Sequence, residues 1–220
     1  LNIQKQRQLR SKNIMTVTIP TTSGKYHFPF QFSPNSKQDR DLLNQLEFLP
    51  SLKEILTIRQ VHALEHATVW VLSELANSGT TKASNESIGG ISTPQGFYLY
   101  GAINLSQLNQ AVEKALQRIT SGEWDLAVHP RCGTKLSVAM TLTAGLALGV
   151  NMLLPPRPIE QLLGFVIAVT AATQLAPGLG DLAQKYLTTA IPFNLRVINI
   201  SLTKDLWGHT AHFVQVSWIN

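Results

Sequence analysis

Two uncharged stretches determine the architecture of this chain: residues 136–156, LSVAMTLTAGLALGVNMLLPP, and residues 161–180, QLLGFVIAVTAATQLAPGLG. The turn Pro155-Pro156-Arg157-Pro158 separates them, and proline cannot continue the first helix because it lacks a backbone N–H. A helix rises about 1.5 Å per residue, so each stretch spans roughly the 30 Å hydrocarbon layer of a bilayer. The pattern predicts a transmembrane helical hairpin. The alternative is a helical hairpin buried in a soluble core.

The composition agrees with a membrane protein. Of the 220 residues, 44% are hydrophobic and only 14% are charged, whereas about 25% charged residues are usual in soluble chains. This length suits one large domain or two small ones, and the apolar content excludes disorder for most of the chain. A single cysteine excludes an internal disulfide. We see no secretory signal peptide, and we expect a reducing, cytoplasm-side compartment.

The net charge of +5 originates at the start of the chain. Six basic residues precede the first acidic residue, Asp39, and the remainder has twelve basic against thirteen acidic residues. We therefore expect residues 1–36 to be a flexible basic arm, at an anionic membrane surface or in solvent, and we do not expect nucleic-acid binding. The six basic residues are Lys5, Arg7, Arg10, Lys12, Lys25 and Lys37.

Around the hairpin, the sequence predicts an α+β fold with a mixed cytoplasmic domain at residues 37–135 and a C-terminal segment with strands at residues 181–220. The transmembrane hairpin itself is assigned to residues 136–180. The sequence predicts helices at residues 42–49, at 51–76 and from the Asn104 cap to Ser121-Gly122. It predicts two short strands within 88–101, around Thr93-Pro94-Gln95-Gly96, and further strands at 194–202 and 213–219.

Within the hairpin, Gly145 and Gly149 form a G-x-x-x-G step, which lets a neighbouring helix approach closely. Basic residues flank the open end of the hairpin at Arg131, Lys135 and Lys185, whereas only Arg157 lies in the turn. Because positive charge accumulates on the cytoplasmic side, we expect both chain termini in the cytoplasm.

The first candidate for chemistry is His62-Ala63-Leu64-Glu65-His66, in the middle of the long predicted helix. At about 100° per residue, His66 lies about 40° from His62 and Glu65 lies about 60° from it on the other side. Two imidazoles at this spacing bind zinc from one helix. H-x-x-E-H is the inverted zincin signature, in which the glutamate activates metal-bound water.

The second candidate is His129-Pro130-Arg131-Cys132-Gly133-Thr134, directly before the first apolar stretch. Histidine and cysteine are both good ligands for zinc, so His129 and Cys132, with His62 and His66, would complete a closed tetrahedral set. If Cys132 stays off the metal, three histidines leave an open position beside Glu65, which is the catalytic arrangement. Arg131 would then hold an anionic substrate group or steady Glu65.

Each candidate also has a simpler interpretation. The histidines can be ordinary surface or core residues, Glu65 can pair with Arg59 or Arg131, and Cys132 can be a small buried hydrophobe. Cys132 is also a possible nucleophile at a helix N-terminus, with His129 or His66 as its base. His209-Thr210-Ala211-His212 is a weaker metal candidate that is typical of a strand edge or a surface turn.

The segments VHALEHATVWVL, GGISTPQGFYLYG and AVHPRCGTKLS, followed by a hairpin, resemble a family of uncharacterised membrane proteins of photosynthetic bacteria that is classed as a domain of unknown function. The resemblance covers about residues 51–190. More distantly, the H-x-x-E-H helix with H-P-R-C-G-T is similar to YqhQ-like bacterial membrane proteins, which are predicted metal-dependent enzymes. The resemblance implies that the site is formed by His62, Glu65, His66, His129, Arg131 and Cys132.

Two hypotheses follow. The first is a zinc-dependent hydrolase at the cytoplasmic surface of the cytoplasmic or thylakoid membrane, with a lipid-proximal or membrane-protein substrate. In it His62, His66 and His129 bind the metal, Glu65 activates water and Cys132 is a fourth ligand or a neighbour. The second is a non-catalytic subunit or assembly factor of a membrane-protein complex with a closed structural metal site.

Overall fold

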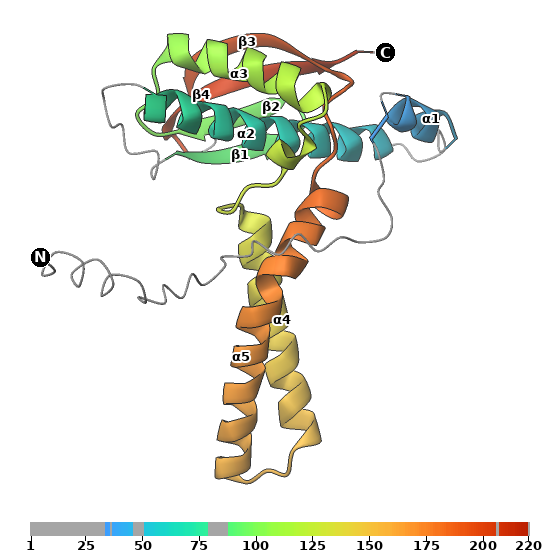
Figure 1. Cartoon of the computed structure of the whole chain (residues 1–220), viewed down its shortest axis with the longest axis vertical. Coiled ribbons are helices and arrows are strands. Elements are labelled where there is room, and N and C mark those ends of the chain that lie inside the picture. The colour runs from blue at the N-terminus through green and yellow to red at the C-terminus, as the bar shows by residue number, and fades with distance from the viewer. Residues whose placement is uncertain (1–33, 36, 46–50, 79–87, 206, 220) are drawn as a thin grey trace, which may run out of the picture. The chain divides into compact units, whose positions relative to one another are not determined.

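The computed structural model describes residues 34–35, 37–45, 51–78, 88–205 and 207–219. The predicted basic arm of residues 1–36 lies outside the described residues, apart from Pro34 and Asn35. Residues 34–220 form one compact unit. The described part of this unit combines helices with an antiparallel sheet, so the α+β prediction is confirmed (Figure 1).

The described elements follow in chain order: α1 (Gln38–Gln45), α2 (Leu52–Ser78), β1 (Gly89–Thr93), β2 (Gly96–Tyr100), α3 (Leu105–Thr120), the 3₁₀ turn η2 (Trp124–Ala127), α4 (Gly133–Leu153), α5 (Pro158–Ala183), the π-helical turn η3 (Gln184–Thr188), β3 (Leu195–Lys204) and β4 (Thr210–Trp218). The four strands lie in the order β1-β2-β4-β3 and every neighbouring pair is antiparallel. Helices α2 and α3 lie over the sheet in Figure 1.

Most predicted elements are present near their expected positions. The two strands around Thr93-Pro94-Gln95-Gly96 are β1 and β2. The Asn104 side chain caps α3 by accepting bonds from the Ser106 and Gln107 N–H groups at 2.8 and 3.3 Å. Helix α1 begins before the predicted residue 42, because Asp39 and Asp41 stabilise its first turn against the helix dipole. Its predicted end, residues 46–49, lies outside the described residues.

The core of the unit lies between α2, α3 and the sheet. Helix α3 buries one face of residues at three- and four-residue spacing, and α2 buries residues almost all round because the sheet, α3 and η2 surround it. Burial of each large apolar side chain stabilises the fold by about 1.5–3 kcal/mol. The fully buried members include Val61, Leu64, Val71, Phe97, Leu99, Leu108, Val112, Ile119 and Val214.

Helices α4 and α5 form the predicted hairpin, and they pack through small residues of α5. Its buried positions are Gly164, Ala168, Ala172, Ala176 and Gly180, one at every fourth residue. A side chain at Gly164 would overlap Val150 of α4 and Leu154, the residue that follows α4. A methyl group at Gly145 or Gly149 would meet nothing within 4 Å, so the G-x-x-x-G step predicted for α4 does not pack this hairpin.

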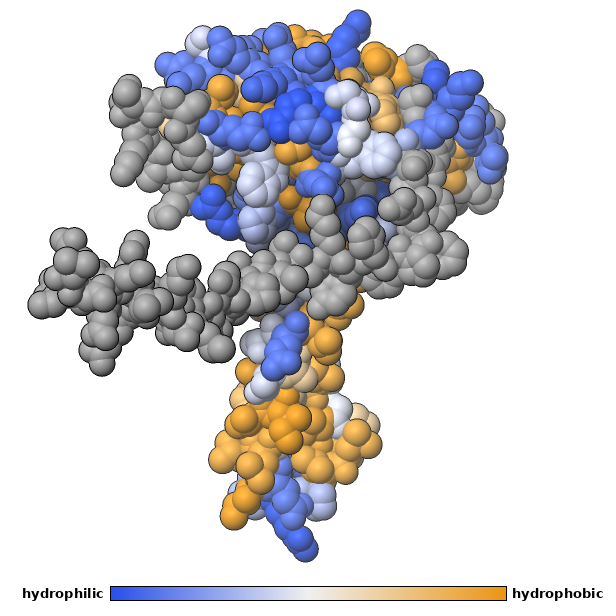
Figure 2. Space-filling view, in the orientation of Figure 1, coloured by the Kyte–Doolittle hydropathy of each residue, from blue (hydrophilic) through white to orange (hydrophobic). Residues whose placement is uncertain are grey.

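The outward faces of the hairpin are apolar. No residue of α4 is buried, and Met140, Leu148, Met152 and Ile167 are each at least 64% exposed. Figure 2 shows this apolar band on the hairpin between polar side chains at its tip and at its other end. Both helices are long and apolar enough to cross a membrane. A soluble core hairpin would bury these faces, and this one exposes them.

Candidate metal centre

Two segments far apart in the sequence bring metal-binding atoms together at the base of the hairpin. Helix α2 supplies His62 and His66, and the residue directly before α4 supplies Cys132. The three ligand atoms all lie within 4.8 Å of one another. Neighbouring ligands of a tetrahedral zinc ion are about 3.3–3.6 Å apart, given Zn–N and Zn–S lengths near 2.0 and 2.3 Å, so small side-chain movements suffice for binding.

The orientation of both imidazoles is fixed by backbone carbonyls. His62 Nδ1 lies 3.0 Å from the Thr188 carbonyl oxygen, and His66 Nδ1 lies 2.6 Å from that of Ala127. A carbonyl oxygen only accepts, so Nδ1 is the protonated nitrogen in each ring. When Nε2 of such a ring gives up its proton, its lone pair is free to bind a metal. This arrangement is usual for histidine ligands in metalloproteins.

Cys132 is held as a thiolate beside these rings. It caps α4, and its Sγ accepts the Thr134 N–H at 3.4 Å and lies 3.3 Å from His62 Nε2. Burial alone would raise the pKa of Cys132, but hydrogen bonds with His62, His66 and Thr134 lower it to about 5. Burial likewise opposes protonation of His62, yet the Cys132 thiolate raises the pKa of His62 above its ordinary value. For the hypothesis that Cys132 is a nucleophile, His129 or His66 is the expected base, and the structure has His62 Nε2 at 3.3 Å from the sulfur.

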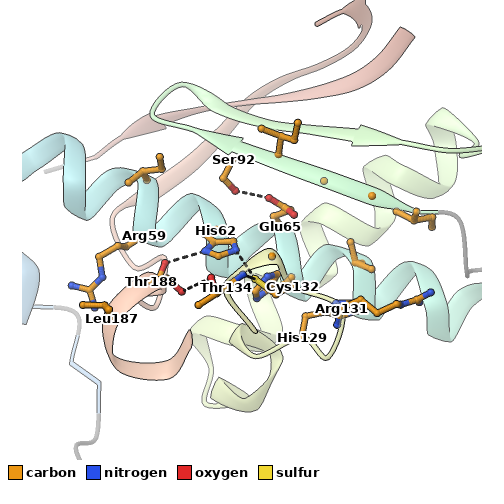
Figure 3. A pocket seen from close by; sticks show the side chains of 18 of the residues that line it. Arg59, His62, Glu65, Ser92, His129, Arg131, Cys132, Thr134, Leu187 and Thr188 are labelled. Atoms are coloured by element: carbon orange, nitrogen blue, oxygen red, sulfur yellow. Dashed lines mark hydrogen bonds between the residues drawn. The ribbon is translucent and has the colours of Figure 1, made fainter. Parts of the chain in front are cut away.

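Glu65 lies on the same helix but is directed toward the sheet. Its carboxylate accepts the Ser92 hydroxyl of β1 at 2.5 Å, and it lies against Gly90, where any side chain would overlap it (Figure 3). Burial raises the pKa of Glu65 above its ordinary value, although Ser92 and the two histidines oppose the shift. A buried carboxyl with a raised pKa beside a candidate metal centre is suited to general-base work.

Neither arginine proposed as a partner of Glu65 forms an ion pair with it among the described residues. The Arg59 Nη2 group donates to the carbonyl oxygens of Tyr186 and Thr189, at 3.1 and 2.9 Å. Arg131 lines the same cavity, and Figure 3 shows its side chain extending away from Glu65. The part of Arg131 that contacts the candidate centre is its backbone N–H, which donates to His129 Nδ1 at 3.3 Å.

His129 lies next to the three-atom cluster without joining it. Its ring is 5.7 Å from the His66 ring and 5.2 Å from the Trp70 ring, measured between centroids. Burial lowers the pKa of His129 to about 4, with the charges of His66, Arg131 and Lys135 acting in the same direction. His129 is thus a neutral neighbour of the centre, and its role as a ligand stays a prediction.

Gln184 fixes the segment around His129. The His129 N–H donates to Gln184 Oε1 at 2.8 Å, and Gln184 Nε2 donates to the His129 carbonyl oxygen at 3.1 Å. Gln184 is fully buried at the start of η3, which extends α5 by one π-helical turn to Thr188. The two ends of the hairpin therefore both shape the centre, since one supplies Cys132 and the other supplies the carbonyl that orients His62.

The centre opens into a cavity of 570 Å³, which is a size typical of small-molecule sites. Its lining includes His62, Glu65, His66 and Cys132, and it also includes four isoleucines and Leu187. Figure 3 shows His62, Glu65, Ser92, Cys132 and Thr188 arranged around this space. The four residues that sequence reasoning missed are Gly90, Ser92, Gln184 and Thr188.

The remaining metal candidate is separate from this centre. His209 lies between β3 and β4, and its Nδ1 is 3.3 Å from the buried carboxylate of Asp205. His212 is paired within β4, opposite Leu99 and Leu202. The turn interpretation therefore describes His209, whereas His212 lies in a central strand of the sheet and not at a strand edge.

The donor set of the main centre fits a metal ion. Two imidazole nitrogens and one thiolate are preferred ligands of Zn²⁺, and three protein ligands are the number found in catalytic zinc sites. The carbonyl partners fix the orientation of both imidazole rings, and the pKa of Cys132 near 5 favours its thiolate, so these ligands need little rearrangement to bind a metal.

Comparison with known proteins places the chain in a family without assigning it an activity. The chain is 50% identical, over 189 residues, to an uncharacterized protein of Picosynechococcus sp., a match that covers 85% of this chain and 92% of that protein. No solved structure matches it. The similarity to YqhQ-like proteins stays a prediction. Residues 57–200 match the family described as a domain of unknown function, DUF6391, and the chain belongs to that family.

Proposed function

We propose that this protein is a membrane-anchored, metal-dependent hydrolase with Zn²⁺ held by His62, His66 and Cys132. One observation carries the proposal: two backbone carbonyls turn the Nε2 atoms of both histidines toward a thiolate at the base of the hairpin. His129 would complete the set only after its ring turns toward the cluster.

In this proposal α4 and α5 cross the cytoplasmic or thylakoid membrane, with both termini in the cytoplasm. The apolar, exposed faces of the hairpin support insertion, because leaving them in water would cost about 25 cal/mol for each Å². Arg131, Lys135 and Lys185 lie at the open end, and Lys135 is paired with Asp181 at 2.5 Å. The metal centre would then lie at the cytoplasmic membrane surface.

The chemistry assigned to the protein residues is general-base hydrolysis. A bound Zn²⁺ supplies Lewis acidity at this position. Glu65 accepts a proton from water as the water oxygen adds to the electrophilic atom of the substrate. The bond to the leaving group then breaks, and Glu65 returns the proton to that group. Ser92 orients the Glu65 carboxylate, and Arg131 would bind an anionic group of the substrate.

A second candidate function is a non-catalytic subunit with a structural metal site. The observation that favours it is that His62 and His66 belong to α2, whereas Cys132 begins the hairpin. A metal ion here would tie the hairpin to the α+β layer and contribute to folding stability. In that case Glu65 would serve only to fix β1 against α2 through Ser92.

The discriminating experiment replaces Glu65 with Gln and compares it with Glu54→Gln, an exposed site on the same helix. Purified protein in nanodiscs would be assayed with acyl ester, peptide and phosphoester substrates, and its metal content measured. The hydrolase proposal expects Glu65→Gln to lose about 10²–10⁴ in rate while keeping its metal. Full activity in that variant would refute it. Metal retention with no turnover by the wild type would favour the structural site.

A further inference from the structure

The cavity beside the metal centre begins where the hairpin begins. Cys132, Gly133 and Thr134 line it from the start of α4, and Leu187 and Thr188 line it from the end of η3. Cys132 is four residues before Leu136, the first residue of the uncharged stretch, which is about 6 Å along a helix. If the hairpin spans a bilayer, the mouth of the cavity lies at the level of the lipid headgroups.

The lining of the cavity includes exposed apolar side chains from three elements. Ile55 of α2 is 52% exposed, Ile91 of β1 is 39% exposed, and Leu187 of η3 is 70% exposed. These residues lie outside the core cluster of the unit. They give the cavity an apolar wall at the height where acyl chains of a bilayer begin.

A cationic group with spare hydrogen-bonding capacity also lines the cavity. Arg59 uses Nη2 to bind two backbone carbonyls, but its buried Nε–H has no hydrogen-bond partner among the described residues. A buried guanidinium N–H without a partner is costly, and an anionic oxygen would satisfy both its charge and its donor. Arg131 adds a second positive charge to the lining.

From these observations we propose that the cavity binds an anionic membrane lipid that enters from the adjacent leaflet. Its hydrocarbon chain contacts Ile55, Ile91 and Leu187, and its headgroup is bound near Arg59. The exposed apolar wall fits a hydrocarbon chain, the unpartnered Arg59 Nε–H fits an acidic group, and the residues shared with the start of the hairpin put both next to the apolar helices. A polypeptide added to the β1 edge would use neither Leu187 nor Arg59.

The role of this lipid as substrate rests on the proposed function. The reaction would be hydrolysis of the carboxylic ester that joins chain and headgroup. The water oxygen bonds to the ester carbonyl carbon, one water proton passes to Glu65, the C–O bond breaks, and Glu65 returns the proton to the leaving alkoxide. One water is consumed, one carboxylic acid and one alcohol form, and nothing is oxidised or reduced.

The test uses the full chain in phosphatidylcholine nanodiscs that contain phosphatidylglycerol with a photoactivatable diazirine on its acyl chain. Cross-linked peptides are mapped by mass spectrometry. We expect labels on the segments of Ile55, Ile91 and Leu187, and about fivefold weaker labelling there in Leu187→Ser, since about 1 kcal/mol of chain contact is lost. Leu202→Ser, which changes a leucine on β3 that is 62% exposed, is the matched control and should label as the wild type.

Charge recognition has its own comparison. Arg59→Gln should abolish the preference for phosphatidylglycerol over a phosphatidylcholine probe, whereas Arg196→Gln, at an exposed position of β3, should preserve it. His62→Ala, which lacks a candidate metal ligand, is labelled in parallel. If it still labels as the wild type does, lipid binding holds even where the metal-dependent hydrolase proposal fails. Labelling confined to α4 and α5, or equal labelling of the Leu187 and Leu202 variants, would overturn the proposal. The alternative occupant is a peptide that binds in the cavity along β1. If an extended peptide slows hydrogen exchange of the β1 amides while lipid labelling of α4 in the wild type stays the same, the cavity binds a polypeptide and the proposal is overturned.

Discussion

Replacing Gly90 with Ala tests how closely β1 holds the proposed base. The new methyl group would overlap Oε1 of Glu65 and lie 2.6 Å from its Cδ and 3.0 Å from its Cγ. The carboxylate is buried and bonded to Ser92, so it cannot move aside without losing that bond. Gly89→Ala is the matched control, because a methyl group there would meet nothing within 4 Å.

The expected cost follows from the two ways in which the protein can respond. If Glu65 moves, the protein loses a hydrogen bond to a charged group, worth about 1.5–3 kcal/mol. If β1 moves instead, overpacking costs about 1–3 kcal/mol. For a chain of this size, these responses lower Tm by about 2–12 °C, whereas Gly89→Ala should change it by about 1 °C.

The assays are thermal unfolding in detergent and metal content of the same samples. We expect Gly90→Ala to unfold at a lower temperature and to retain metal, because His62, His66 and Cys132 are not touched by the new methyl group. Under the hydrolase proposal, turnover falls as well. Equal melting temperatures for the Gly89 and Gly90 variants would refute the placement of Glu65 against β1.

Two further predictions concern other parts of the fold. Bonds from Tyr100 and the Trp207 and His209 N–H groups outweigh burial and lower the pKa of Asp205 to about 2. Its carboxylate therefore stabilises the fold above the ordinary pKa near 4, and this contribution disappears as pH falls through about 2. Unfolding curves should show Asp205→Asn less stable than the wild type at pH 7 and equal to it near pH 2. Separately, Gly164→Leu should disrupt the hairpin and lower Tm, whereas Gly149→Leu should not. Equal effects of the two glycine variants would contradict the observed packing face.

Local patterns in the sequence were enough to predict most of the fold. The absence of charge over residues 136–156 and 161–180 predicts the hairpin, because each stretch is long and apolar enough to form a helix that could cross a membrane and prolines separate the two. Helical periodicity places His62 and His66 on one face, and the structure brings Cys132 to that same face. These predictions depend only on neighbours in the chain.

The missing parts of the site depend on contacts between distant segments. The Thr188 carbonyl that orients His62 is 126 residues away from it, and carbonyl groups leave no mark in a sequence. The Ser92–Glu65 bond depends on which face of β1 lies against α2, which strand periodicity alone does not fix. Similarly, the G-x-x-x-G pattern of Gly145 and Gly149 gave no indication that the packing face lies on α5 at Gly164.

Metal content decides whether this centre is real. Wild type, His62→Ala and Cys132→Ala would be purified in detergent, reconstituted with zinc, and measured by elemental mass spectrometry beside His209→Ala as a control outside the cluster. The account predicts one zinc per chain in the wild type and in His209→Ala, with loss of zinc from both of the other variants. Wild type without zinc after reconstitution, or zinc retained by His62→Ala and Cys132→Ala, would contradict it.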